Sequence, residues 1–203
     1  MRYFSAAPMR NRPPIQGLVS RRCLLLAAAW PFASARSADA EVDALLRAGG
    51  VVVGLRHASA PGTFDPPGFR LGDCSTQRNL DAAGRAQARR LGAWFAAQRL
   101  VPATVRSSPW CRCLDTARLA FGDERVQAWD ALGSVRQGDA SAQVAALRAS
   151  LGRIAPGRFE VWVSHQFTLN ALAGQGTASG EGLVLAGGPD GGAPRVLGRL
   201  APP

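Results

Sequence analysis

Apolar runs separated by helical patterns divide the chain into short, alternating elements. The two most apolar runs, residues 51–55 and 159–163, are typical of strands buried on both faces of a sheet. The alternation predicts an α/β fold with a mainly parallel central sheet and helices on both faces, ending in a C-terminal hairpin. We expect strands at 51–55, 104–108, 125–128, 159–164, 182–186 and 195–200, and helices at 41–48, 82–98, 110–120, 139–154 and 168–173.

The first 40 residues have the pattern of an export signal. Arg21 and Arg22 precede an apolar, alanine-rich stretch that ends near Ala33 and is too short for a stable membrane anchor. The paired arginines are typical of twin-arginine export, and a small-x-small cleavage site ends at residue 40. The sequence therefore predicts a signal peptide at 1–40, a mature domain at 41–203, and a periplasmic or secreted protein without a stable membrane anchor.

Charge changes this picture only slightly. The formal net charge of +10 falls to +5 without the first 40 residues, because these contain six arginines and one aspartate. The remaining basic side chains are all arginine, and they form neither a basic repeat nor a stripe interleaved with aromatic residues. This composition favours an anionic small substrate and argues against a nucleic-acid partner.

The only two histidines of the chain each follow a predicted buried strand. His57 comes directly after Arg56, at the end of the first strand, and His165 comes after the strand at 159–164. Because ligands of open α/β sheets bind at the carboxyl ends of the strands, both imidazoles are expected at one edge. Arg112 follows the strand at 104–108 and would reach the same edge, so two imidazoles and two guanidiniums would form a phosphate pocket.

A metal site is a weaker interpretation of the same residues. Two histidines without a nearby HxxxH or paired CxxC pattern supply too few ligands for zinc, so we expect no metal and no cofactor. Three cysteines remain in the mature part. In an oxidising compartment Cys74 could form a disulfide with Cys111 or Cys113, and three buried, reduced cysteines are the alternative.

Three motifs resemble those of the histidine phosphatase superfamily, which has the phosphoglycerate-mutase-like fold. The likeness extends over residues 50–186 and is greatest to small exported bacterial members. The resemblance implies that His57 is a nucleophile that becomes phosphorylated, and that Arg56, Arg112 and His165 bind the phosphoryl oxygens. The motifs are Leu55-Arg56-His57, Ser107-Ser108-Pro109-x-x-Arg112-x-x-x-Thr116-Ala117 and Val163-Ser164-His165, with Leu80-x-x-x-Gly84-x-x-Gln87-Ala88 between the first two.

The chain departs from the family pattern at two positions. Ala58 replaces the usual glycine after the first histidine, and Ser134 lies where many members have a glutamate that protonates the leaving oxygen. Asp130 and Glu181 are the candidate substitutes for that proton donor. Arg78, which precedes the long helix, is a candidate contact for the substrate beyond its phosphate.

These observations predict an exported, metal-independent phosphatase that hydrolyses phosphomonoesters through a phosphohistidine. The expected substrate is a phosphorylated small molecule, and the family resemblance suggests a phosphosugar of the cell envelope. A catalytically degraded module that only binds a phosphate ligand is the alternative, because the proton donor is not identified. The sequence does not indicate an oligomeric state.

Overall fold

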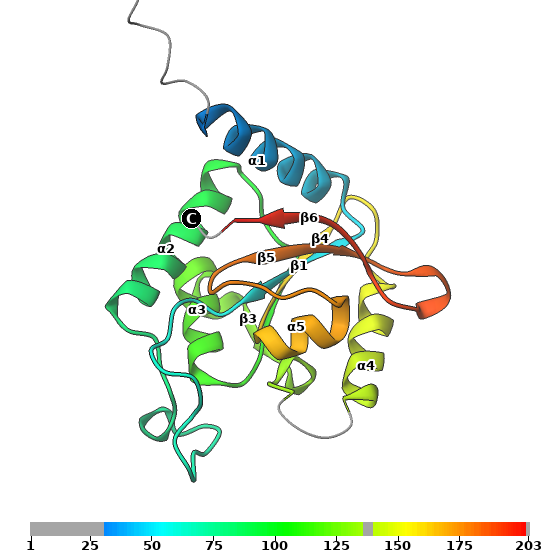
Figure 1. The fold of residues 1–203 in the computed structure, drawn as a ribbon. Coiled ribbons are helices and arrows are strands. Elements are labelled where there is room, and N and C mark those ends of the chain that lie inside the picture. Colours follow the sequence, from blue (N-terminus) through cyan, green and yellow to red (C-terminus); the bar gives the residue numbers. More distant parts are fainter. Residues whose placement is uncertain (1–30, 136–139, 202–203) are drawn as a thin grey trace, which may run out of the picture. The chain divides into compact units, whose positions relative to one another are not determined.

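The computed structural model describes residues 31–135 and 140–201 (Figure 1). The twin-arginine motif at Arg21 and Arg22 lies outside these residues. The first helix, α1 (Pro31–Ala48), begins earlier than the expected start at residue 41, so the predicted cleavage site falls within a helix. Among the described residues, no helix is long and apolar enough to cross a membrane.

The six strands of the described residues form one mixed sheet with the order β3-β2-β4-β1-β5-β6 (Figure 1). The pairs β1–β4, β4–β2 and β2–β3 are parallel, whereas β5 is antiparallel to both β1 and β6. The prediction of a mainly parallel sheet with a C-terminal hairpin is therefore confirmed. The strands are β1 (Val51–Arg56), β2 (Thr104–Ser107), β3 (Val126–Ala128), β4 (Phe159–Ser164), β5 (Gly182–Ala186) and β6 (Arg195–Leu200).

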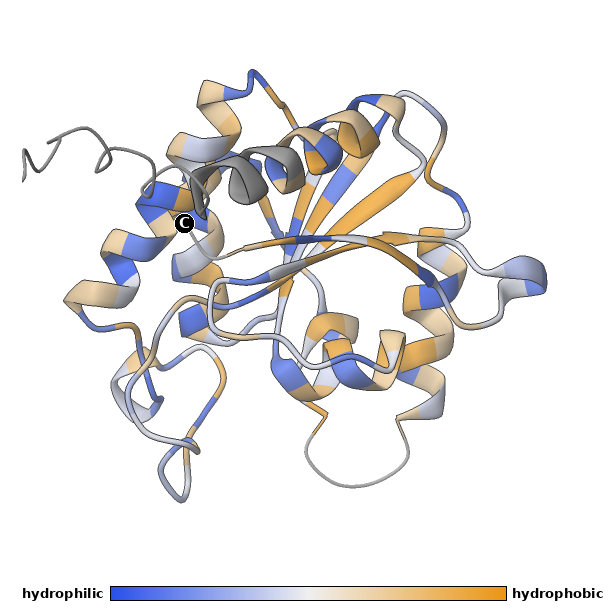
Figure 2. Ribbon diagram, turned by 45° about the horizontal axis from the view of Figure 1, so that its top comes forward, coloured by the Kyte–Doolittle hydropathy of each residue, from blue (hydrophilic) through white to orange (hydrophobic). Residues whose placement is uncertain are grey.

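Alternating side chains of the central strands are buried under helices on both faces of the sheet. Val51 and Val53 pack in one cluster with side chains of α1, α2 and α3, while Val52 packs in the other with side chains of α4 and α5. Figure 2 shows the central strands mostly in the hydrophobic colour and the helices in mixed colours, as expected for half-exposed helices. The helices are α2 (Ala82–Ala97), α3 (Cys111–Phe121), α4 (Ser141–Leu151) and α5 (Gln166–Ala173).

Local signals explain where helices begin. Asp81 is the N-cap of α2, as its position suggests, because its carboxylate accepts a hydrogen bond of 2.7 Å from Gly84 N. Gly84 also permits a close approach of α2 to the loop that follows His57, since a Cβ at position 84 would lie 1.9 Å from Ser59 O. Helix α5 begins two residues before the expected Thr168, directly after His165, whose backbone is extended.

Strand register brings the two histidines together. Arg56 of β1 lies opposite Ser164 of β4, so the residues that follow, His57 and His165, leave neighbouring strands at the same edge. The backbone continues this pairing beyond β1, because His57 N donates to Ser164 O over 3.0 Å. On the other side of β4, Ser108 N donates to Val163 O over 2.9 Å, and α3 with Arg112 begins shortly afterwards.

Candidate active site

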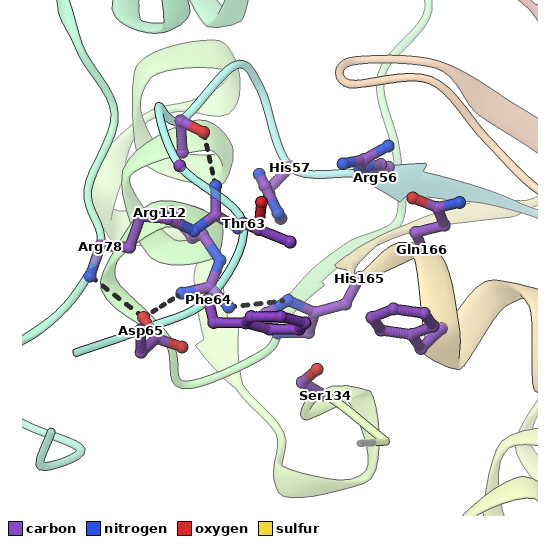
Figure 3. A pocket seen from close by; sticks show the side chains of 13 residues that line it. Arg56, His57, Thr63, Phe64, Asp65, Arg78, Arg112, Ser134, His165 and Gln166 are labelled. Carbon is purple, nitrogen blue, oxygen red and sulfur yellow. Dashed lines mark hydrogen bonds and ion pairs between the residues drawn. The ribbon is translucent and has the colours of Figure 1, made fainter. Parts of the chain in front are cut away.

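A polar cavity of about 220 Å³ lies at this edge of the sheet (Figure 3). All four residues of the predicted phosphate pocket line it, as does the candidate substrate contact Arg78. Figure 3 shows them approaching from separate parts of the chain: the end of β1, helix α3, the segment before α2, and the beginning of α5. The residues in question are Arg56, His57, Arg78, Arg112 and His165.

The hydrogen bond of His57 shows which of its ring nitrogens is free. Nδ1 lies 2.7 Å from the carbonyl oxygen of Ala58. A carbonyl oxygen only accepts, so Nδ1 bears the proton and Nε2 has a free lone pair. Burial lowers the pKa of His57 to about 3, and the nearby guanidiniums, Arg112 first among them, act in the same direction. The imidazole is therefore neutral and nucleophilic at physiological pH.

His165 is held by two partners. Its Nε2 lies 2.8 Å from Ser108 Oγ, and a guanidinium nitrogen of Arg112 lies 3.3 Å from its Nδ1. Because a guanidinium only donates, Nδ1 accepts and Nε2 donates to the serine hydroxyl. Burial, and then the charge of Arg112, lowers the pKa of His165 well below its usual value. The two imidazoles meet edge to face, with ring centroids 5.6 Å apart.

Three guanidiniums lining the cavity have unused hydrogen-bond donors. The Nε atoms of Arg56, Arg78 and Arg112 are buried and have no hydrogen-bond partner among the described residues. Burial lowers the pKa of Arg56 and of Arg78, and repulsion by Arg112 adds to the effect. Unpaired buried donors and crowded positive charges both destabilise the cavity. An oxyanion bound there would accept hydrogen bonds from the donors and reduce the repulsion between the charges.

Asp65 is a functional residue that the sequence analysis did not identify. It lies on the loop after the first histidine and forms an ion pair of 2.8 Å with Arg112, in which both side chains are almost fully buried. Its carboxylate also accepts from the backbone N of Arg78 and from the indole of Trp110. Burial alone would raise the pKa of Asp65, but these hydrogen bonds and the Arg112 charge outweigh it and lower the pKa. Asp65 is thus an ionised partner that orients Arg112.

The only sequence signal for Asp65 is its position as the single acid of the Pro- and Gly-rich loop at 60–72, which follows the first histidine. Its partner is 47 residues away along the chain. No periodicity connects residues at that separation, so the pairing is visible only in the folded chain.

The predicted proton donors do not line the cavity. Glu181 instead forms an ion pair with Arg199 of β6, and it accepts a 2.6 Å hydrogen bond from Ala178 N. Its backbone oxygen accepts from Arg56 N, but its side chain contacts Arg199 and not the cavity. Asp130 is the first residue of a short 3-10 helix, Asp130–Leu132, and does not line the cavity. Ser134, at the position of the family glutamate, does line the cavity.

The structure joins Cys74 to Cys111, one of the two pairings that the sequence left open. The disulfide connects the end of the loop that contains Asp65 to the first residue of the helix that contains Arg112. Cys113 is a buried thiol whose Sγ lies 3.5 Å from His165 Nε2. Burial raises the pKa of Cys113 to about 12, so it remains a thiol that packs beneath His165.

Replacing both Cys74 and Cys111 by alanine is expected to lower the free energy of unfolding by about 3 to 4 kcal/mol, because the bridge closes a loop of 37 residues. Urea unfolding of the purified chain would measure this loss. Reductant should destabilise the wild-type chain to a similar extent and leave the double variant unchanged. Equal stability of the oxidised and reduced wild-type chains would contradict the prediction.

The lowered pKa values of the histidines have a direct spectroscopic consequence. An ordinary imidazole with a pKa of about 6.5 is about 97 % protonated at pH 5, whereas His57 with a pKa of about 3 stays neutral there. NMR spectra of the ring protons should therefore show no titration of His57 or His165 between pH 8 and pH 5. The assignment is simple because the chain has only two histidines. A transition of either ring near pH 6.5 would refute the buried, neutral state.

Metal ligands are not grouped in this region. Among residues 31–135 and 140–201, no cluster of three or more His, Cys, Asp or Glu side chains could hold a metal ion. The described residues of the cavity offer a neutral imidazole with a free Nε2 and guanidinium donors around it. Such an arrangement suits transfer of a phosphoryl group, whose charge is spread over its oxygens.

Comparisons with known proteins agree with this chemistry. The family profile of the histidine phosphatase superfamily (branch 1) matches residues 72–167. This match includes Arg112 and His165, while Arg56 and His57 precede it. No match is found among curated proteins.

Solved structures extend the likeness beyond the matched segment. A protein from Agrobacterium tumefaciens assigned as the phosphohistidine phosphatase SixA is 27% identical, with a TM-score of 0.52, and the match covers 75% of this chain and 98% of that one. The protein histidine phosphatase SixA in complex with tungstate is 19% identical, with a TM-score of 0.54 and coverage of 75% and 97%. A phosphoserine phosphatase mutant from Entamoeba histolytica is 14% identical, with a TM-score of 0.52 and coverage of 73% and 95%. The profile match over residues 72–167, together with the fold and the paired strand-end histidines, supports the histidine phosphatase superfamily for this chain.

Proposed function

We propose that the protein is a phosphatase that hydrolyses phosphomonoesters through a phosphohistidine at His57, without a metal ion. The observation that supports this most is the set of three guanidiniums whose buried Nε atoms have no partner among the described residues, and which line the same cavity as His57. A phosphoryl group would accept hydrogen bonds from these donors while facing the nucleophile. The similarity to proteins described as phosphohistidine phosphatases supports a phosphatase in general.

The proposed reaction has two steps. In the first, Nε2 of His57 forms a bond to phosphorus while the bond between phosphorus and the leaving oxygen breaks. Arg56 and Arg112 donate hydrogen bonds to the transferring oxygens and stabilise their charge. His165, whose ring nitrogens are engaged by Ser108 and Arg112, positions Arg112 for this contact. In the second step, water attacks the phosphohistidine, which restores the neutral imidazole and releases inorganic phosphate.

Trapping the intermediate tests this proposal. The full chain is incubated with an activated aryl phosphate in the presence of EDTA, quenched in alkali, and digested for mass spectrometry. We expect turnover that EDTA does not change, and a peptide containing His57 that is heavier by one phosphoryl group, labile in acid and stable in base. If no phosphate is released from this easily cleaved substrate, the alternative of a module that only binds a phosphate ligand is favoured.

We also propose that the protein is exported to the periplasm or secreted, where it acts on a phosphorylated small molecule. The twin-arginine pattern and the following apolar stretch support export. The Cys74–Cys111 disulfide gives independent support, because such bonds persist mainly in oxidising compartments.

A further inference from the structure

Two phenylalanines are exposed on the wall of the otherwise polar cavity. Phe64, on the loop after His57, and Phe167, in the first turn of α5, line the same cavity as the guanidiniums. Their exposed fractions are 60% and 52%, although both are large apolar side chains. In the view of Figure 3, the ring of Phe64 lies between the side chains of His165 and Ser134. Single exposed phenylalanines are ordinary, but two on the wall of one charged cavity suggest contact with an apolar part of the ligand.

Among residues 31–135 and 140–201, the same cavity offers no suitable acid for the leaving group. Among the described residues that line it, the one carboxylic acid is Asp65. Asp65 is ion-paired with Arg112 and accepts two further hydrogen bonds, so it is ionised and has no proton to give. Ser134 can donate a hydrogen bond to a leaving oxygen, but a hydroxyl is too weak an acid to protonate it.

A leaving group that departs without a proton must be a weak base. A phenol has a pKa of about 10, as in tyrosine. An aliphatic alcohol resembles water, whose pKa is about 16, and its alkoxide is therefore a far poorer leaving group. A phenol also has a flat, apolar ring of the kind that packs against phenylalanine. The lack of a suitable acid among the described cavity residues and the two exposed rings thus favour the same chemical class.

We propose that the substrate is a phosphate monoester of a phenol, whose ring contacts Phe64 and Phe167. This inference rests on the proposed phosphatase function. In the first step the phosphorus–oxygen bond to the ring breaks, its electron pair leaves on the phenolate, and the bond to Nε2 of His57 forms. Water then releases phosphate, and the phenolate takes a proton from solvent. A small aryl phosphate and a phosphotyrosyl peptide present the same group, and the cavity of about 220 Å³ accepts the ring and phosphate of either.

Three substrates separate the two parts of the proposal in the purified full chain. Phenyl phosphate has the ring and a phenolate leaving group, benzyl phosphate has the ring and an alkoxide, and glucose 6-phosphate represents the phosphosugars. We compare kcat/KM because it reports the formation of the phosphohistidine, whereas the hydrolysis of this intermediate is common to all substrates. We expect kcat/KM for phenyl phosphate to exceed that for benzyl phosphate by at least about 100-fold, which is the smallest usual contribution of a general acid. We expect Kd in the inactive His57→Asn variant to be similar for these two substrates and higher for glucose 6-phosphate.

Variants of the two rings test the contact directly. Phe64→Ala and Phe167→Ala should each raise KM for phenyl and benzyl phosphate by about 3- to 10-fold. Inhibition by inorganic phosphate should not change, since phosphate contacts the arginines and not the rings. Leu71→Ala is the matched control, because Leu71 is an exposed apolar residue of the same loop and does not line the cavity. It should leave every KM unchanged.

Each result supports or overturns the inference separately from the proposed function. Equal kcat/KM values for phenyl and benzyl phosphate would show that an acid assists departure and would overturn it. Unchanged KM values in both phenylalanine variants, or a preference for glucose 6-phosphate, would overturn it as well. Turnover of a phosphotyrosyl peptide at the rate of phenyl phosphate would identify the peptide as the source, and much slower turnover would identify a small aryl phosphate. Failure of the proposed function would differ from all of these, since no substrate would release phosphate.

Discussion

Replacing His57 by alanine is expected to lower kcat on an aryl phosphate by about 10⁴- to 10⁶-fold, the range seen when an enzyme loses its nucleophile. The reason is geometric. The Ala58 carbonyl holds Nδ1–H, so Nε2 is the atom available for attack, and the buried ring stays neutral at the pH of the assay. Phosphate release at saturating substrate would measure the loss.

His57→Asn is the companion variant, because its amide fills part of the space and can still donate to the Ala58 carbonyl. It should be as inactive as the alanine variant while unfolding at nearly the same temperature as the wild-type chain. Both variants should still bind inorganic phosphate through the arginines. A residual kcat within about 10-fold of wild type would mean that phosphoryl transfer goes directly to water, and the phosphohistidine mechanism would then be wrong.

The Arg112→Ala substitution is expected to lower kcat/KM by about 10³-fold. It removes a charged donor to the transferring oxygens, and it also removes the hydrogen bond that Arg112 donates to His165. It should also lower the free energy of unfolding by about 3 to 5 kcal/mol. The substitution leaves Asp65 ionised, buried and without its charged partner. Steady-state kinetics and urea unfolding would measure the two losses separately.

Two further variants separate these effects of Arg112. Adding Asp65→Asn to Arg112→Ala removes the unpaired charge, so stability should largely return while kcat/KM stays low. Arg112→Lys retains the positive charge but cannot contact Asp65 and a phosphoryl oxygen through a planar fork, so it should restore only part of the activity. Recovery of full activity in the double variant would show that Arg112 acts on the fold alone.

The order and type of most elements could be predicted because neighbouring residues encode them. The apolar runs of β1 and β4 and the Asp81 cap of α2 are local signals, and the structure follows them closely. The ends of some helices differ from their predicted positions. Helix α4 ends at Leu151, earlier than its apolar pattern suggests, and α1 begins before the expected residue.

The sequence by itself determined which residues meet at the edge of the sheet. A parallel pairing of two buried strands must bring the residues after them together, and this is how His57 and His165 become neighbours. Arg56 ends the first of these strands and Arg112 follows β2, which is the neighbour of the second, and all four residues line the cavity. Strand order was sufficient for these four residues because each lies at the end of its strand or within a few positions after it.

Only the tertiary structure decided the protonation states and the bonding partners of the residues at that edge of the sheet. The Asp65–Arg112 ion pair and the choice of Cys111 as the partner of Cys74 join segments that no local pattern connects. The neutral state of both imidazoles depends on burial by the whole fold, which a sequence window does not contain. The structure likewise directs Glu181 to Arg199 and leaves Ser134 and two phenylalanines at the cavity. Long-range pairing and desolvation are properties of the packed chain, and they decide how the four predicted residues are able to react.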